Sequence, residues 1–284
     1  MARYDATKLS YQLIYNSIVN QWTDWAIETN TTKVVIGISG GKDSSVVATI
    51  AVRIFGKENV YGVLMPQTEQ ENEAYEICEF LGIKPITIEI GTAVNDILSQ
   101  FNSGDPSSNN LAWPPSEQTK TNLPARIRMA TLYAVAQTVG GKVINTCNLS
   151  EDMVGYSTLF GDDCGAYAPL KDLTATEVKY LGKQLGLPEW AWNKTPSDGL
   201  CGKTDEDNLG FTYEALDEII RTGETYKASF AQKVSIYRKH WNNRFKTQLI
   251  RLPYPKIDRV LIGEDQFINL ANWLPTLTGQ IFNK

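Results

Sequence analysis

The stretch that decides the fold is Lys33–Ser44, which reads KVVIGISGGKDS. Its first half, residues 33–38, is a continuous apolar and largely β-branched run, which is typical of a strand that is buried on both faces. A glycine–serine turn follows, and Val46–Phe55 then predicts a helix. A strand, a tight turn and a helix in this order begin a parallel α/β sheet, whose βα turns lie at the edge where ligands bind.

Strands and helices continue to alternate along the rest of the chain. We expect further strands over 60–64, 85–90 and 142–146, and further helices over 7–28, 68–81, 93–101, 124–139, 174–185, 213–220 and 226–240. Two long polar segments, 102–121 and 193–211, are expected to be loops. The alternation predicts an α/β fold of the Rossmann-like type, with three layers: a mainly parallel sheet and helices on both of its faces.

The composition argues against several classes of function. The 284 residues are 42% hydrophobic and carry a net charge of −5, and nucleic-acid-binding domains are usually basic, so a nucleic-acid partner is not expected. No apolar run reaches the roughly 18 residues that a membrane helix needs, and the first ten residues do not resemble a signal peptide. The four cysteines lie far apart, which favours a cytoplasmic protein without a disulfide scaffold. With a single histidine, His240, the chemistry is expected to depend on carboxylates, hydroxyls, lysine and arginine.

The turn at 39–44 has the composition of a phosphate site. Gly40 and Gly41 allow a positive φ and a close approach of the backbone, so that N–H groups and the positive end of the following helix point at one place. Asp43 would repel a phosphate unless a cation lies between them, which implies Mg²⁺. The turn is not a Walker A loop, which would need glycine at position 36 and serine or threonine at 43. The alternative is a tight strand–helix turn that binds no ligand.

Four blocks of sequence resemble those of known enzymes. The sequence SGGKDS at 39–44 resembles the pyrophosphate loop of the ATP-pyrophosphatase superfamily, whose fold is called adenine nucleotide α-hydrolase-like. The other blocks resemble, in the same order, those of ammonia-dependent NAD synthetases: 122–129, 146–162 and 196–210. The resemblance implies one NAD synthetase-like domain over 1–284, with a core at about 33–220, an N-terminal helix at 7–28 and a C-terminal extension at 221–284.

The resemblance also implies a role for individual residues. Asp43 and Ser44 would be catalytic, and Asp43 would bind Mg²⁺ together with Glu151. The residues implied to bind ATP are Gly37, Ser39, Gly40, Gly41, Lys42, Asp43, Ser44, Met65, Thr146 and Ser197. Those implied to bind deamido-NAD are Arg126, Phe160, Asp162 and Lys246.

The implied activity is that of a carbon–nitrogen ligase, an ammonia-dependent NAD synthase. It would convert deamido-NAD and ammonia to NAD, with ATP as co-substrate, through an adenylated carboxylate, and it would release AMP and pyrophosphate. The family also implies a homodimer, with small-molecule substrates and with no nucleic acid or membrane as partner. Two alternatives stay open: another ligase of the superfamily that acts on a different carboxyl or carbonyl group, and a nucleotide-binding module without catalysis. The aromatic helix at 7–28 could lie at a dimer interface or pack within one subunit.

The sequence departs from the family pattern in three places. Ala166 stands where many members have an acidic residue, and Ala175 stands where many have a lysine. The family's C-terminal His-Lys motif is absent, and Lys246 or Arg244 is a possible substitute.

Two further roles stay open between several residues. Lys42 or Lys171 could supply the positive charge that is missing near the triphosphate. The group that takes a proton from ammonium is one of four carboxyls: Asp162, Asp163, Asp198 and Asp205.

Overall fold

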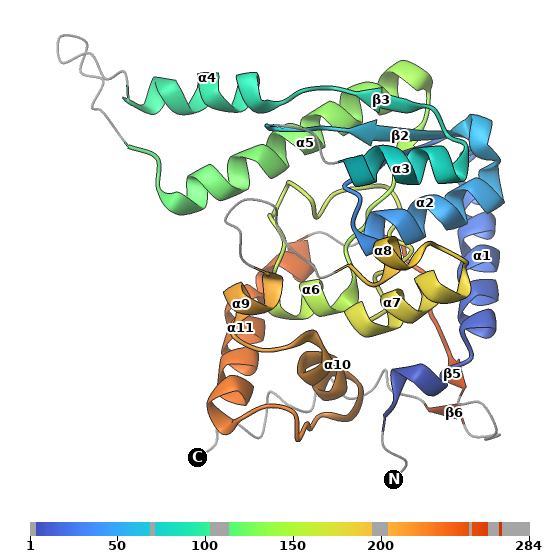
Figure 1. Cartoon of the computed structure of the whole chain (residues 1–284), viewed down its shortest axis with the longest axis vertical. Helices are drawn as coiled ribbons and strands as arrows, with labels where there is room; N and C mark the ends of the chain where they lie inside the picture. The colour runs from blue at the N-terminus through green and yellow to red at the C-terminus, as the bar shows by residue number, and fades with distance from the viewer. Residues whose placement is uncertain are drawn as a thin grey trace.

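A four-stranded parallel sheet lies at the centre of the computed structural model (Figure 1), which describes residues 4–68, 72–102, 114–194, 204–249, 252–260 and 267–268. Its order is β3-β2-β1-β4, and its strands are β1 (Val34–Gly37), β2 (Val60–Leu64), β3 (Pro85–Thr87) and β4 (Lys142–Val143). In the register, Val34 lies opposite Val60 on one side and opposite Lys142 on the other. A separate antiparallel pair joins β5 (Arg259–Val260) to β6 (Phe267–Ile268).

The helices surround this sheet. They are α1 (Tyr11–Glu28), α2 (Lys42–Phe55), α3 (Asn72–Leu81), α4 (Gly91–Asn102), α5 (Glu117–Val139), α6 (Leu149–Val154), α7 (Ala175–Gln184), α8 (Glu189–Trp192), α9 (Asp205–Leu209), α10 (Tyr213–Thr222) and α11 (Phe230–Leu249), with short 3₁₀ turns at Ala6–Lys8 and Lys57–Asn59. Helix α4 and the first part of α5 extend away from the rest of the molecule in Figure 1. Among the helices that the structure describes, none is long and apolar enough to cross a membrane.

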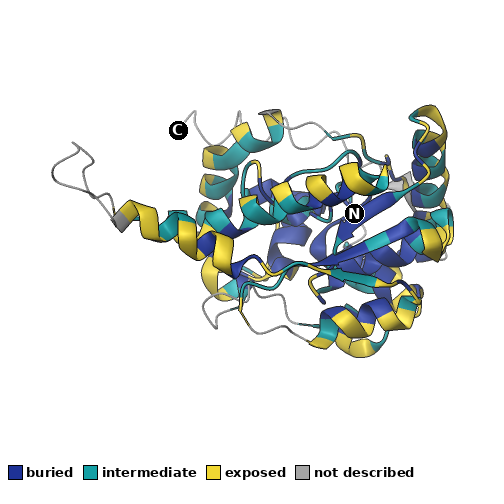
Figure 2. Cartoon of the chain, turned by 90° about the horizontal axis from the view of Figure 1, so that it is seen from above, coloured by how far each residue is buried: buried dark blue, intermediate teal, exposed yellow. Residues whose placement is uncertain are grey.

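Alternate residues of β1 pack into different layers. Val34 and Ile36 belong to a large apolar core that includes α1 and α2, whereas Val35 packs with Leu132 of α5 on the opposite face. Because helices cover both faces, the first three residues of β1 are buried, and its sequence is a continuous apolar run. Figure 2 shows the middle of the sheet mostly in dark blue between helices whose outer faces are yellow. The predicted three-layer α/β arrangement is confirmed.

The aromatic side chains of α1 pack inside the subunit. Trp22 is fully buried and stacks on Tyr167, with 5.6 Å between the ring centroids. Its ring also meets Phe55 of α2 edge-on. Of the two roles considered for this helix, packing within one subunit is the one that these contacts support.

Several predicted boundaries are wrong. Helix α5 begins at Glu117 rather than at Pro124, because Ser116 caps it by accepting a hydrogen bond from the Thr119 N–H. Part of the second predicted loop is helix α9, which a capping box between Thr204 and Asp207 begins. Strands β3 and β4 end earlier than predicted, and the last helix, α11, lies further along the chain, at 230–249 rather than 226–240.

Candidate functional site

The loop between β1 and α2 is held in shape by its own side chains. The hydroxyls of Ser39 and Ser44 lie 3.1 Å apart, and the Gly41 N–H donates to Ser39 Oγ. Gly40 has φ +75°, and a Cβ there would lie 2.9 Å from the Cβ of Glu73, so only glycine fits without a shift of α3. The loop's own groups therefore define its shape, and the N-terminus of the 14-residue helix α2 lies behind it.

Lys42 and Asp43 form an ion pair at the first turn of α2. Lys42 is only 6% exposed, and its Nζ lies 2.7 Å from Asp43 Oδ2. The same Nζ lies over the ring of Tyr213, 5.8 Å from its centroid. Burial alone would lower the pKa of Lys42, but the carboxylates of Asp43 and Glu151 outweigh it and hold the pKa above its ordinary value. Lys42 is therefore a buried ammonium ion among carboxylates.

Asn148 joins the two carboxylates that are candidates for a metal site. It is the N-cap of α6, and its side-chain oxygen accepts hydrogen bonds from the N–H groups of Ser150 and Glu151. Its side-chain amide donates to Asp43 Oδ1 at 3.0 Å, and its backbone N–H donates to Glu151 Oε2, also at 3.0 Å. Glu151 is therefore a helix-capping residue, and Asn148 connects it to Asp43, with which it is implied to bind Mg²⁺.

A cation between Asp43 and Glu151 would stabilise their ionised forms. Burial first and the charge of Asp43 second raise the pKa of Glu151 well above its ordinary value, although Lys42 lowers it in part. A divalent ion between the two groups would remove that cost. The described residues contain no cluster of three or more histidine, cysteine, aspartate or glutamate side chains that could hold a metal. Two carboxylates completed by phosphate oxygens and water are a usual site for Mg²⁺, so the residues present fit that ion.

The residues implied to bind deamido-NAD meet around the loop 155–163. Arg126 of α5 donates from Nε to the carbonyl of Leu159, and Lys246 of α11 donates to the carbonyls of Gly155 and Ser157, each at 2.7 Å. Asp162 accepts from the Thr158 N–H at 2.8 Å. Phe160 has φ +57° and is 56% exposed. Helices α5 and α11 therefore hold one loop that presents both Phe160 and Asp162.

The substitutes considered for the missing family residues have different contacts in the structure. Lys246 reaches the loop 155–163, whereas the guanidinium of Arg244 lies on the Trp241 ring of its own helix. Lys171 pairs with Asp152 at 2.6 Å, whereas Lys42 belongs to the loop 39–44 itself.

Three of the four carboxyls considered as the base lie in described residues. Asp205 is near the hydroxyls of Tyr156 and Tyr213. Asp162 accepts the Thr158 N–H, whereas Asp163 is 1% exposed and its buried Oδ1 has no hydrogen-bond partner. Burial, with further contributions from Asp152 and Asp162, raises the pKa of Asp163 to about 6. Asp198 lies outside the described residues.

Of the other residues implied to bind ATP, Met65 and Thr146 lie in described residues. Met65 follows β2, and its Cε would be 3.4 Å from a Cβ placed at Gly37. Thr146 is half-buried between β4 and Asn148. Ser197 lies outside the described residues.

Sequence reasoning did not assign a role to Asn148 or to Arg128. Asn148 is in the block that carries the family resemblance, and the order Asn-Leu-Ser-Glu at 148–151 is the signal for a helix N-cap. Its bond to Asp43 spans 105 residues of sequence, so no local pattern indicates it. Arg128 donates from Nε to the Met65 carbonyl and thereby ties α5 to the end of β2.

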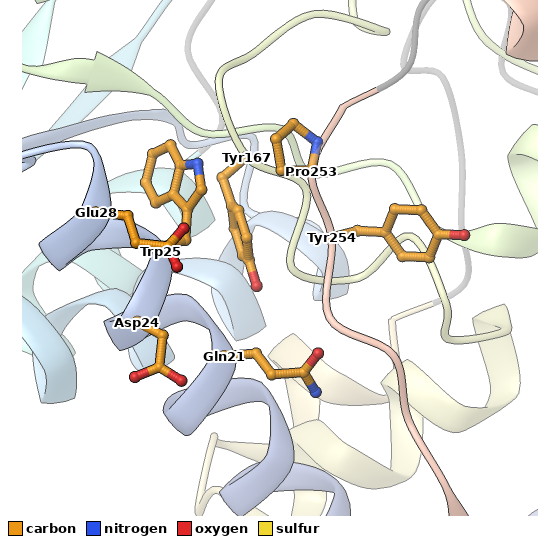
Figure 3. Close-up of a pocket in the computed structure, with 7 residues that line it drawn as sticks. All are labelled: Gln21, Asp24, Trp25, Glu28, Tyr167, Pro253 and Tyr254. Atoms are coloured by element: carbon orange, nitrogen blue, oxygen red, sulfur yellow. The ribbon is translucent and has the colours of Figure 1, made fainter.

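A recess of about 260 Å³ lies away from these residues, between α1 and the segment 252–258 (Figure 3). It is lined by Gln21, Asp24, Trp25, Glu28, Tyr167, Pro253 and Tyr254. Since no residue implied to bind ATP or deamido-NAD lines it, we do not assign it to the reaction.

Comparison with known proteins identifies the family. The family model described as NAD synthase matches residues 14–249. The NH(3)-dependent NAD(+) synthetase of Thermococcus sibiricus is 38% identical over 215 residues, which cover 75% of this chain and 81% of that protein. That of Trichlorobacter lovleyi is 34% identical over 85% of this chain and 90% of its own length. Among solved structures, an NMN synthetase from Francisella tularensis aligns with a TM-score of 0.74 and 32% identity, over 86% of this chain and 98% of that one. The NH3-dependent NAD synthetase from Campylobacter jejuni aligns with a TM-score of 0.65 and 28% identity, over the same shares of the two chains. The chain belongs to the NAD synthase family.

Proposed function

We propose that this protein is an ammonia-dependent ligase that converts the nicotinate carboxylate of deamido-NAD to the amide and consumes ATP, with release of AMP and pyrophosphate. The observation that carries the proposal is the connection from the loop 39–44 through Asn148 to Glu151 in a chain of this family. A module that only binds nucleotide has no need for two linked carboxylates at its phosphate loop. The family match also argues against a ligase of another branch of the superfamily.

The first step is the attack of the nicotinate carboxylate on the α-phosphorus of ATP. The nucleophile is already ionised, so the protein needs no base at this stage, and its main task is to stabilise charge on the leaving pyrophosphate. The amides of the loop 39–44 and the N-terminus of α2 face that group, and the Ser39 and Ser44 hydroxyls can donate to it. Asp43 and Glu151 would hold Mg²⁺, which supplies positive charge to the phosphates when it is bound.

The second step needs ammonia rather than ammonium, and we propose Asp163 as the group that takes the proton. Of the three considered carboxyls that lie in described residues, it is the one with a buried oxygen, Oδ1, that has no hydrogen-bond partner. It belongs to the loop 155–163, next to Asp162, which the family resemblance connects with the substrate. A pKa of about 6 leaves it ionised at neutral pH and basic enough to accept a proton.

A second candidate substrate follows from the structural comparison. The Francisella tularensis protein, which aligns with a TM-score of 0.74, is an NMN synthetase. NMN contains the same nicotinamide as NAD and lacks the adenylate half. The loop 39–44 would bind the phosphates of ATP in the same way with either substrate. The choice between the two substrates therefore depends on residues that would contact the adenylate half of deamido-NAD.

One experiment tests both candidates. The purified protein is mixed with ATP, Mg²⁺ and ammonium, and then with deamido-NAD, with nicotinate mononucleotide or with neither, and pyrophosphate and amide product are measured. Release that depends on deamido-NAD supports the main proposal, and a higher kcat/KM with the mononucleotide supports the second. Asp43→Asn should lower turnover about 100-fold or more while circular dichroism stays unchanged. ATP binding without turnover of either acceptor would contradict both candidates.

We also propose that the protein forms a homodimer in the cytoplasm. Large apolar side chains are exposed on the extending α4–α5 region and on α11, among them Phe101, Tyr133, Phe230 and Phe245. A second copy would cover such surface. The three described cysteines, Cys78, Cys147 and Cys164, are free, which fits a reducing compartment. Sedimentation would test the dimer, since a monomer at micromolar concentration contradicts it.

A further inference from the structure

We propose that Lys42 is a built-in counter-cation of the metal site: it compensates part of the negative charge of Asp43 and Glu151 while no divalent ion is bound, and it must leave Asp43 before one can bind. This inference rests on the proposed function, because it takes Asp43 and Glu151 as the metal ligands. It concerns the residue between Gly41 and Asp43, for which the family resemblance implies only contact with ATP.

The first line of evidence is the place of the ammonium group. Lys42 is buried at the first residue of α2, where the positive end of the helix dipole disfavours a cation. Its Nζ nevertheless lies 2.7 Å from Asp43 Oδ2, and it interacts electrostatically with Glu151 and with Asp205. An ammonium ion is found in such a position only when carboxylates compensate it.

The second line of evidence is that both carboxylate oxygens of Asp43 already have a partner. Asp43 Oδ1 accepts from Asn148, and Asp43 Oδ2 is paired with Lys42. Mg²⁺ requires ligand oxygens at about 2.0–2.1 Å in a nearly octahedral arrangement. A divalent ion on Asp43 would therefore lie within a few ångströms of the Lys42 ammonium, and the two like charges would repel strongly in this partly buried site.

When a metal ion replaces Lys42 at Asp43, the Lys42 ammonium can move to the phosphates of a bound nucleotide. Lys42 belongs to the same loop as the amides that face the phosphates, so an ammonium released from Asp43 stays within side-chain reach of a bound phosphate. The nucleotide thus provides a second place for the Lys42 charge. Metal binding should be weak in the free protein for this reason, and a neutral residue at position 42 should make it tighter.

The test measures the binding of Mn²⁺ alone, without nucleotide. Free Mn²⁺ is followed by electron paramagnetic resonance during titration of the wild type, Lys42→Met, Asp43→Asn and Lys120→Met. The last is a matched control, because Lys120 pairs with Glu117 on the exposed face of α5, away from the loop. We expect Lys42→Met to bind Mn²⁺ about tenfold more tightly or better, Lys120→Met to be unchanged, and Asp43→Asn to bind more weakly.

A second measurement separates this role from a purely structural one. Removal of Lys42 leaves two carboxylates without a counter-charge, so the unfolding midpoint of Lys42→Met should fall in the absence of metal. Added Mn²⁺ should then raise it more than it raises the wild-type midpoint, because the stabilisation of the folded state by a ligand grows with the logarithm of the ligand's affinity. Lys42→Gln, whose amide can still donate to Asp43, serves for both measurements if the methionine variant does not fold.

The outcomes distinguish the inference from the function on which it rests. If Asp43→Asn weakens Mn²⁺ binding while both Lys42 variants bind no more tightly than the wild type, the counter-cation role is refuted and the metal site survives. If Asp43→Asn has no effect on Mn²⁺ binding, the metal site itself is refuted, and the role of Lys42 falls with it.

Discussion

The substitution Asp163→Asn should stabilise the protein at neutral pH. Asp163 is 1% exposed, its buried Oδ1 has no hydrogen-bond partner, and its pKa is raised to about 6 from an ordinary 3.8. The acidic neighbours Asp152 and Asp162 contribute to that rise, whereas Lys171 and Lys246 oppose it. The folded protein therefore prefers the protonated carboxyl, and ionisation of this group costs stability.

The sign and the size of the effect follow from proton linkage. Because the folded pKa lies above the unfolded one, the unfavourable contribution of Asp163 is absent below about pH 4, grows as the pH rises, and is complete somewhat above pH 6. One pKa unit corresponds to about 1.36 kcal/mol, so the upper bound is about 3 kcal/mol. Because water reaches the neighbouring exposed Asp162 and screens part of this cost, we expect a gain of about 1 to 3 kcal/mol for Asp163→Asn at pH 7.5.

The assay is urea unfolding of the wild type and Asp163→Asn at pH 4.5, 5.5, 6.5 and 7.5. The difference between the two proteins matters, since the titration of all other groups cancels in it. The control is Asp96→Asn, which removes the same charge from the exposed surface of α4 and should change the free energy of unfolding by less than about 0.5 kcal/mol. A difference that does not depend on pH, or a variant that is less stable at pH 7.5, would refute the reasoning. If Asp163 is also the base, the stabilised variant should lose amide formation.

Three further predictions concern residues that support the shape of the protein and of its site. Arg221→Met should lower the free energy of unfolding by about 3–5 kcal/mol, because it leaves Glu177 buried without its bidentate partner at 2.6 and 3.0 Å; adding Glu177→Gln should restore part of it in urea unfolding. Asn148→Asp should keep the cap of α6 but place a third carboxylate beside Asp43 and Glu151. Without metal, this variant should be less stable than Asn148→Ala, and Mg²⁺ should restore its stability. Thermal unfolding with and without Mg²⁺ measures both effects. Gly40→Ala should abolish ATP binding in calorimetry while the circular dichroism spectrum stays native, because alanine is strained at φ +75° and its Cβ would meet Glu73; unaltered ATP affinity would contradict a role of this loop shape.

The parts of the fold that depend on local chemistry could be predicted from the sequence. The apolar run at 33–38, the glycine turn and the helix behind it follow from burial and backbone freedom alone, and the structure confirms them. The start of α5 could not be predicted in the same way. Pro124 favours a helix start locally, and the helix continues through it because Ser116 supplies a cap eight residues earlier.

The contacts that build the site were harder to predict because they join distant parts of the chain. The order Asn148 to Glu151 indicates a helix cap, but the bond from Asn148 to Asp43 depends on how two strands pair. The choice between the two proposed substitutes for the C-terminal family motif is a similar case. Lys246 and Arg244 are two residues apart in sequence, and only the packing of α11 decides that Lys246 faces the loop 155–163.

The order of the strands explains why the chemistry gathers where it does. From β1 the chain moves outward through β2 to β3, and it then returns to place β4 on the other side of β1. The loops that leave β1 and β4 thus diverge at the carboxyl edge of the sheet, and a point of reversed strand order is where open α/β sheets bind ligands. The first loop leads into α2 with Lys42 and Asp43, and the second leads into α6 with Asn148 and Glu151. The pairing of two short strands thus brings together groups that the sequence keeps about a hundred residues apart. A substitution that weakens the pairing of β1 with β4 should therefore weaken metal binding without touching a ligand, whereas one at the outer strand β3 should not.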